Sequence, residues 1–222
     1  MIFVKLLLFA CALGISLEEI NGHGMMMSPV SRSSAWREGF PVEINYNDNE
    51  LFCGGFQIQM EQNGGKCGEC GDNYALPRPR PNDNGGIYGL GIIVKKYSPN
   101  EIINVKVQLT ANHRGTFRFN LCQLMNEHHV ETEECFDEHP LQLADGSYEL
   151  SVPPSKAKFD IPIRLPANFT CEHCVLRWHY RTGNNWGECE DGSTGLGCGP
   201  QETFRNCADV SILSPASNSS SS

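Results

Sequence analysis

The sequence predicts an all-β protein, an antiparallel β-sandwich of the immunoglobulin or fibronectin type with short helices and long loops stapled by disulfides. Three observations support this prediction. Several short segments alternate apolar and polar residues with the period of two that is typical of strands. Glycine- and proline-rich stretches separate these segments, and cysteines occur throughout the longest of the stretches. No long segment shows the apolar periodicity of an amphipathic helix.

Five segments carry the strand pattern. Pro162 interrupts the third, and because proline has no backbone N–H to donate, we expect this strand at the edge of a sheet. Trp178 alternates within the fourth and is expected to point into the core. The run Met25–Met27 is expected to pack as an early strand rather than to bind a metal. The five segments are residues 101–110, 116–122, 158–165, 174–180 and 208–212.

Two loops are unusually long for a compact domain, residues 41–86 and residues 181–206. Loops of this length are usually functional. Both contain cysteines, so disulfides would let them present a defined surface without a large core of their own. We therefore expect the functional site of the protein to involve these loops.

The first 22 residues are expected to be a signal peptide and not part of the fold. Lys5 precedes an apolar run that is too short to cross a bilayer. Cleavage is expected after Gly22, with Gly14 and Ser16 as alternative positions. Residues 23–213 then form one domain, and residues 214–222 form a serine-rich tail that we expect to be disordered.

Cysteine usage also predicts export. Cys11 lies in the predicted signal peptide, and the ten remaining cysteines are an even number, which indicates disulfides in a secreted chain. Two Cys-x-x-Cys units have spacings seen in zinc sites, but disulfides are the preferred interpretation here. The pairing stays open. The ten cysteines are Cys53, Cys67, Cys70, Cys122, Cys135, Cys171, Cys174, Cys189, Cys198 and Cys207.

Charge and sequons limit the partners. The net charge of −9 argues against nucleic acid and anionic membranes as partners, and it is compatible with a neutral polymer. Sequons at Asn168 and Asn218 predict N-glycosylation. We expect an extracellular monomer that binds no membrane.

His23 and His113 are the candidate metal ligands. After cleavage at Gly22, His23 would offer its α-amino group and its ring Nδ1, which both deprotonate readily near neutral pH. A third nitrogen from another ring would complete a T-shaped site, and such donors favour Cu²⁺ among divalent first-row ions. His113 lies between two predicted strands, at a rim where loops build sites. Taken alone, each is more often an ordinary terminal or surface histidine, so the surrounding motifs decide.

Six short motifs occur along residues 23–212. They are His-Gly at 23–24, Glu-Leu-Phe-Cys-Gly-Gly at 50–55, Lys-Cys-Gly-Glu-Cys-Gly-Asp at 66–72, Thr-Ala-Asn-His-Arg-Gly at 110–115, Trp-Gly-Glu-Cys at 186–189 and Gly-Pro-Gln-Glu-Thr-Phe-Arg-Asn-Cys-Ala-Asp-Val at 199–210. Each motif is weak alone, but their order and combination are specific. In them the chain resembles the lytic polysaccharide monooxygenases, specifically the animal-rich auxiliary activity family fifteen.

The resemblance implies a histidine brace within a copper monooxygenase domain at residues 23–213. One copper ion would be held by the amino group and Nδ1 of His23 and by Nε2 of His113. Phe204 would stand at the axial position and shield the metal, and Ala111 would be the small residue packed beside it.

Further residues are candidates for supporting roles. Glu202 lies two residues before Phe204 and would face the same way on a strand. Its carboxylate would hydrogen-bond to oxygen at the copper or relay a proton, with Gln201 as the alternate, although a surface salt bridge is an equal alternative. The aromatics expected on a polymer-binding face are Tyr46, Trp186 and Trp36.

The resemblance implies oxidative cleavage of crystalline β-1,4-linked polysaccharide, with chitin as the first substrate and cellulose as the second. An external donor would reduce the copper, which would use O₂ or H₂O₂ to hydroxylate C1 or C4. Two alternatives stay open, a copper carrier with the same histidines and a non-catalytic chitin-binding matrix protein. A glycoside hydrolase is disfavoured because no carboxylate pair stands out.

Overall fold

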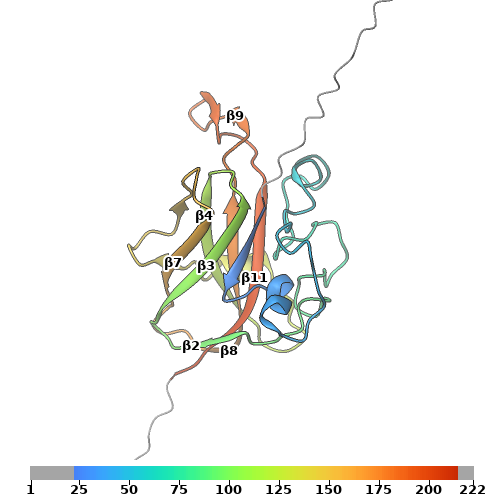
Figure 1. The fold of residues 1–222 in the computed structure, drawn as a ribbon, viewed down its shortest axis with the longest axis vertical. Coiled ribbons are helices and arrows are strands. Elements are labelled where there is room, and N and C mark those ends of the chain that lie inside the picture. Colours follow the sequence, from blue (N-terminus) through green and yellow to red (C-terminus); the bar gives the residue numbers. More distant parts are fainter. Residues whose placement is uncertain (1–22, 215–222) are drawn as a thin grey trace, which may run out of the picture.

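The computed structural model describes residues 23–214, which form two packed β-sheets and a separate hairpin (Figure 1). The first sheet has the order β1 (His23–Ser28), β3 (Ile102–Ala111), β7 (Lys158–Arg164), β5 (Gln142–Leu143). The second has the order β2 (Lys95–Tyr97), β11 (Thr203–Ile212), β8 (Cys171–Arg181), β4 (Thr116–Gln123), β6 (Leu150–Ser151). The hairpin consists of β9 (Trp186–Glu188) and β10 (Thr194–Leu196). The predicted β-sandwich is confirmed. The predicted signal peptide and Asn218 lie outside the described residues.

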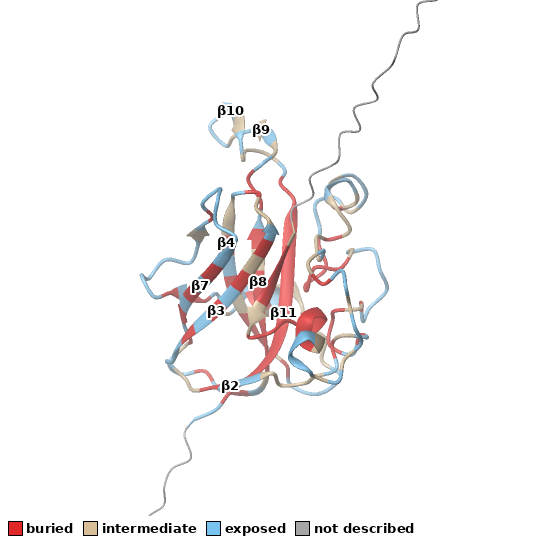
Figure 2. Ribbon diagram, in the orientation of Figure 1, coloured by how far each residue is buried: buried red, intermediate tan, exposed pale blue. Residues whose placement is uncertain are grey.

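The strand pairs are antiparallel except for β2 and β11, which run parallel. All five predicted segments are strands, but β8 and β11 begin earlier than predicted. In β11 every residue is buried, as Figure 2 shows along its length. A strand that is covered on both faces has no polar face to alternate with, so the period of two marks only part of it.

The expectation that Pro162 marks an edge strand is wrong in one respect. β7 pairs with β3 along its whole length, and its end also pairs with the two-residue strand β5, which forms the edge. The carbonyl of Pro162 accepts a hydrogen bond from the N–H of Ala144, at 2.9 Å, on the β5 side. The backbone N–H and C=O groups of one strand residue point to the same side of the strand. The missing N–H of Pro162 therefore faces the side where the partner strand is only two residues long.

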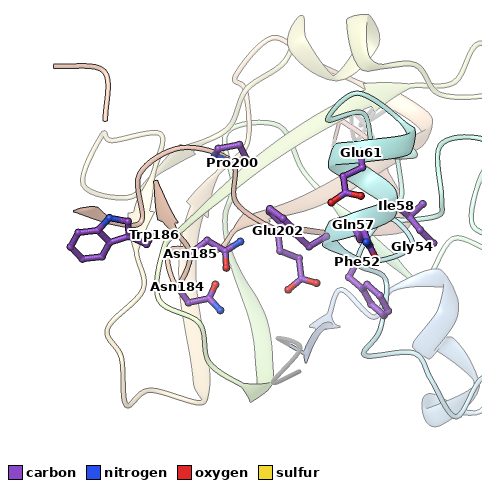
Figure 3. A pocket seen from close by; sticks show the side chains of 12 residues that line it. Phe52, Gly54, Gln57, Ile58, Glu61, Asn184, Asn185, Trp186, Pro200 and Glu202 are labelled. Atoms are coloured by element: carbon purple, nitrogen blue, oxygen red, sulfur yellow. The ribbon is translucent and has the colours of Figure 1, made fainter. Parts of the chain in front are cut away.

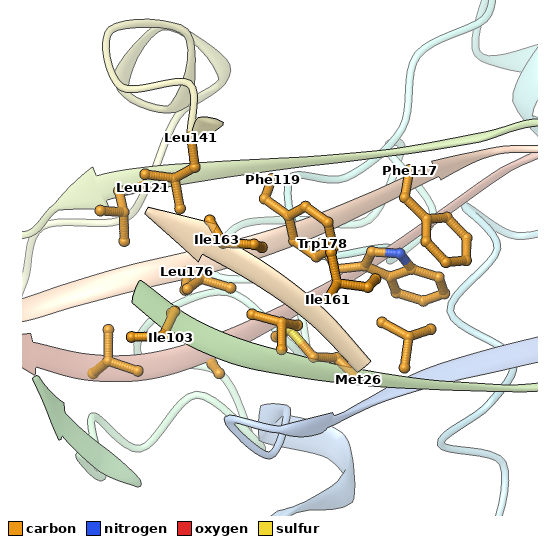
Figure 4. Close-up of a cluster of buried hydrophobic side chains, with 14 of the residues drawn as sticks. Met26, Ile103, Phe117, Phe119, Leu121, Leu141, Ile161, Ile163, Leu176 and Trp178 are labelled. Atoms are coloured by element: carbon orange, nitrogen blue, oxygen red, sulfur yellow. The ribbon is translucent and has the colours of Figure 1, made fainter. Parts of the chain in front are cut away.

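The core lies between the two sheets and is rich in aromatic rings (Figure 4). β3 and β7 alternate buried and exposed residues, as their sequences predict. Trp178 is fully buried, and Phe117 contacts both Trp178 and Tyr180 edge-on with ring centroids 5.2 and 4.9 Å apart. Edge-to-face contacts of this kind stabilise a core beyond the area that they bury. The sheets thus form a rigid platform under the loops.

An outer layer of loops packs against β11. It includes the short helices η1 (Arg32–Glu38) and η2 (Ile58–Gln62), and α1 (Glu133–Asp137) packs on β4. Arg32 is buried and donates to both carboxylate oxygens of Asp209 in β11, at 2.8 and 2.6 Å. A buried ion pair with two bonds fixes the position of η1 on the sheet.

Five disulfides hold the layer and the loops, as the even cysteine count predicts. Cys70 is bound to Cys207 and so belongs to a different pair from Cys67, which excludes a zinc site at that Cys-x-x-Cys unit. The pairs are Cys53–Cys67, Cys70–Cys207, Cys122–Cys135, Cys171–Cys174 and Cys189–Cys198.

Candidate metal centre

The strand register brings the two candidate histidines to one rim of the sandwich. His23 opens β1 and pairs with Ala111, close to the end of β3. His113 lies two residues beyond Ala111, in the turn that leads to β4. Since β1 and β3 are antiparallel, the start of one meets the end of the other. His23 is half-buried and His113 is buried, so the site opens to solvent from the His23 side.

Gly24 lets β1 approach the sheet this closely. A Cβ at position 24 would lie 2.5 Å from Cδ2 of Leu109 and 3.0 Å from the ring of Trp178. The N–H of Gly24 donates to the carbonyl of Asn49 at 3.0 Å, which ties the strand to the loop beside it. The His-Gly motif is therefore explained by close packing directly after the candidate ligand.

His113 is held by contacts on its backbone and on its ring. Its N–H donates to the hydroxyl of Tyr180 at 3.0 Å, and its carbonyl accepts from the N–H of Gly183 at 2.8 Å. The ring Nδ1 lies 3.0 Å from the amide nitrogen of Asn184. A metal on Nε2 leaves the proton on Nδ1, and Asn184 then accepts it through Oδ1, which a half-turn of the amide brings to the same place.

The environment of His113 favours the form that binds metals. Burial lowers the pKa of the imidazole, and the charge of the neighbouring His23 lowers it further. The ring is therefore neutral near pH 7, and only a neutral imidazole has a lone pair for a metal.

Tyr180 links His113 to the residues at the start of β11. Burial raises the pKa of Tyr180, and the charge of Glu202 raises it further, so the phenol stays protonated. The ring of Phe204 stacks on Tyr180 with centroids 5.7 Å apart, and Phe204 is fully buried. The structure thus assembles His113, Tyr180, Glu202 and Phe204 around one corner of the sandwich.

Glu202 and Gln201 differ in their contacts. Glu202 is buried, and its carbonyl accepts from the N–H of Thr182 at 3.0 Å. The amide of Gln201 instead bonds to the backbone of Asn185 on both sides, at 3.0 and 3.1 Å, and to the carbonyl of Cys198 at 2.7 Å. Gln201 therefore fixes the base of the β9–β10 hairpin.

A hollow lies beside this corner, between the hairpin and η2 (Figure 3). Glu202 lies in the middle of it, with Asn184, Asn185 and Trp186 on the hairpin side. The opposite side is formed by Phe52, residues 54–58 and Glu61. The hollow is wide and polar, and it adjoins the candidate metal centre through Asn184, which contacts His113.

Of the three aromatics predicted for a polymer-binding face, two are strongly exposed. Tyr46 is 77% exposed and Trp186 is 71% exposed. Trp36 is half-buried, packs edge-on against Tyr46 with centroids 5.5 Å apart and donates through its indole N–H to the carbonyl of Asn45 at 3.1 Å. Trp36 thus packs against the exposed ring of Tyr46 and helps to hold it in position.

The donor set fits copper. The register of β1 and β3 brings two histidines to one rim, and Nε2 of His23 faces Glu50 at 3.4 Å, which leaves Nδ1 for a metal. Among the described residues, the potential ligand atoms of Cys70, Glu131 and Cys207 also lie close together. They offer no thiolate to a metal, because the two cysteines form a disulfide. Met25 and Met26 are buried in β1, in agreement with a packing role.

The sequence did not assign roles to three residues at this site. Tyr180 lies in a predicted strand, but its contact with His113 depends on the pairing of β8 with β4. Asn184 and Glu50 lie in loops, where no periodicity places a side chain. Only the tertiary structure brings them to the two histidines.

Asn168 is exposed. Between residues 23 and 214, none of the helices has the length and apolar character needed to cross a membrane.

Comparisons with known proteins agree on one family. Residues 23–210 match the family model described as "Lytic polysaccharide mono-oxygenase, cellulose-degrading". A solved structure of an AA15 lytic polysaccharide monooxygenase from Thermobia domestica, in the Cu(I) state, is 49% identical and superposes with a TM-score of 0.84. The match covers 86% of this chain and 98% of that one. A comparison with curated proteins gave no match.

Proposed function

The chain belongs to the lytic polysaccharide monooxygenases and is a copper-dependent polysaccharide monooxygenase, and we propose that it is secreted and cleaves crystalline β-1,4-linked polysaccharide, chitin first and cellulose second. The observation that carries the proposal is the pairing of His23 with Ala111, which places the start of β1 beside His113 at an exposed rim. Such a site suits a substrate that is a flat solid and cannot enter a cleft.

One copper ion would be held by the amino group and Nδ1 of His23 and by Nε2 of His113, once the chain begins at His23. When it is bound and reduced by an external donor, copper supplies the O₂ or H₂O₂ chemistry that hydroxylates C1 or C4 of the sugar. The remaining work belongs to the chain. Its residues fix the two rings, keep one side of the centre dry and hold the polymer in place.

Three residues near His113 would shape the centre. Tyr180 fixes the backbone of His113 through its hydroxyl. Phe204 is buried against Tyr180 and would keep water from that side of the centre, while Ala111, the strand partner of His23, keeps the neighbouring position small. Glu202 would hold or pass a proton beside the substrate, because its carboxylate lies in the hollow next to the centre (Figure 3).

The polymer would rest on Tyr46 and Trp186. Each ring is exposed for most of its surface and offers a flat apolar face for a sugar ring. Asn184 and Asn185 line the hollow beside Trp186 and offer amides for the polar groups of the sugar.

The experiment uses protein that begins at His23 and is loaded with copper. It is incubated with β-chitin or cellulose and ascorbate, and soluble products are analysed by mass spectrometry. We expect oligosaccharides with one added oxygen, which disappear with EDTA or with His113→Ala and persist with His128→Ala, the loss of an exposed histidine elsewhere. Copper-loaded protein that gives no oxidised products from either polymer would contradict the proposal and favour a copper carrier. Polysaccharide binding that chelators leave intact, without products, would favour a matrix protein.

A further inference from the structure

Glu50 makes the contact on the outer nitrogen of His23. Its Oε1 lies 3.4 Å from Nε2 of His23, and its side chain is 40% exposed. We propose that Glu50 is a positioning residue that holds the His23 ring through Nε2–H and adds negative charge to the copper site. This inference rests on the proposed function, in which Nδ1 of His23 binds copper.

The backbone on either side of Glu50 is fixed. The carbonyl of Asn49 accepts from Gly24 of β1 at 3.0 Å, and the side chain of Asn49 donates to Thr110 of β3 at 3.1 Å. On the other side, the carbonyl of Leu51 accepts from Arg205 of β11 at 3.1 Å. The backbone that carries Glu50 is therefore anchored to three strands, which keeps the start of its side chain at a fixed place beside His23.

The contact has a direct effect on the chemistry of the ring. A neutral imidazole that binds a metal through Nδ1 carries its proton on Nε2. A carboxylate that accepts this proton fixes the tautomer and the ring orientation and makes Nδ1 a stronger donor. Because Cu(II) carries more charge than Cu(I), the anionic partner stabilises Cu(II) more.

The partner of His113 is different in kind. Its outer nitrogen faces the neutral amide of Asn184, whereas that of His23 faces a carboxylate. Either partner can orient a ring, but the carboxylate contributes a charge to the metal. Of the two outer contacts, only that of Glu50 with His23 therefore brings a negative charge close to the metal.

The test compares Glu50→Gln with wild type, both starting at His23. Glutamine keeps the size and an acceptor oxygen and removes the charge. We expect the affinity for Cu(II) to fall about tenfold relative to that for Cu(I), the scale of such outer contacts. A tenfold change in this ratio raises the reduction potential by about 59 mV. The Cu(II) electron paramagnetic resonance spectrum should shift with it.

Glu172→Gln is the matched control, because it removes the same charge at the exposed end of β8 away from Tyr180. Its potential should equal that of wild type. If Glu50→Gln also left the potential and spectrum unchanged, Glu50 would have no role at the metal. If wild type itself bound no copper through three nitrogens, the proposed function would fail instead.

A second measurement needs no variant. Cu(I) is diamagnetic, so proton resonance of the reduced wild-type protein can observe the Nε2–H of His23. We expect this proton to exchange slowly with water because the Glu50 carboxylate accepts it. Exchange as fast as in a free imidazole would overturn the inference.

Discussion

At the scale of single residues, the site depends on polar contacts to atoms that do not bind the metal. Tyr180 holds the backbone of His113, Asn184 faces its ring, and Glu50 faces the ring of His23. Contacts of this kind decide which nitrogen of a histidine is available and in which direction it points. The two histidines could be predicted from sequence, whereas their partners could not, because the partners come from segments far away along the chain.

Tyr180→Phe tests the backbone contact. The change removes the hydroxyl that accepts from the buried N–H of His113 and leaves that donor without its partner. A buried donor left unsatisfied costs about 1–3 kcal/mol, so we expect a loss of this size in the free energy of unfolding measured with urea. Tyr46→Phe, at an exposed ring, should change it by less than about 0.5 kcal/mol. Equal stability of Tyr180→Phe and wild type would contradict the role given to the hydroxyl.

At the scale of elements, the exposed and half-buried strands followed their sequence pattern and the fully buried ones did not. β3, β4 and β7 alternate and were predicted nearly to their ends. β11 begins five residues before its predicted segment, because loops cover the face that would otherwise be polar. The parallel pairing of β2 with β11 could not be predicted, because β2 has only three residues and its pairing partner is set by the tertiary structure.

The β9–β10 hairpin extends from the sandwich beside the site (Figure 1) and carries Trp186 opposite Leu196. The Cys189–Cys198 disulfide and Gln201 fix its base, so Trp186 is held on a stiff support. We expect Trp186→Ala to weaken binding to β-chitin by about 1 kcal/mol, roughly fivefold in Kd, which is the scale of an aromatic contact.

Copper binding by Trp186→Ala should remain as in wild type, because the ring makes no contact with the histidines that the structure records. Tyr148→Ala serves as control, since Tyr148 is 50% exposed and lines a different hollow with Arg118 and Glu149. Undiminished chitin binding by Trp186→Ala in a pull-down isotherm would remove the hairpin from the polymer-binding face.

At the scale of the whole molecule, the outer loop layer is joined to the sandwich by buried charges and disulfides. Burial alone would raise the pKa of Asp209, but the charge and hydrogen bonds of Arg32, together with His173, hold it below its usual range. Glu131 contacts the same guanidinium. The Cys70–Cys207 disulfide joins the layer to the same strand. The layer carries Glu50 and Tyr46, so its attachment also fixes one side of the site.

The lowered pKa of Asp209 predicts a dependence of stability on pH. A carboxyl with a depressed folded-state pKa stabilises the fold above its unfolded pKa, about 3.9, and loses this contribution as pH falls through the folded value. Asp209→Asn should therefore cost about 3–5 kcal/mol at pH 7, the scale for removing one partner of a buried pair, and less below about pH 4.

Urea unfolding at pH 7 and pH 3.5 measures this difference between variant and wild type. Asp160→Asn, at an exposed position on β7, should show only a small effect at both values. A cost for Asp209→Asn that does not shrink in acid would contradict the assignment of the stabilisation to the charged pair.

We propose above all that His23, as the first residue, binds copper together with His113. Calorimetric titration with Cu²⁺, combined with electron paramagnetic resonance, should compare protein starting at His23 with protein that carries one extra glycine before it. We predict one tight ion and a three-nitrogen spectrum for the first protein. The second, whose amino group is displaced, should bind far more weakly and lose that spectrum. Equal affinity and identical spectra for the two proteins would contradict the claim.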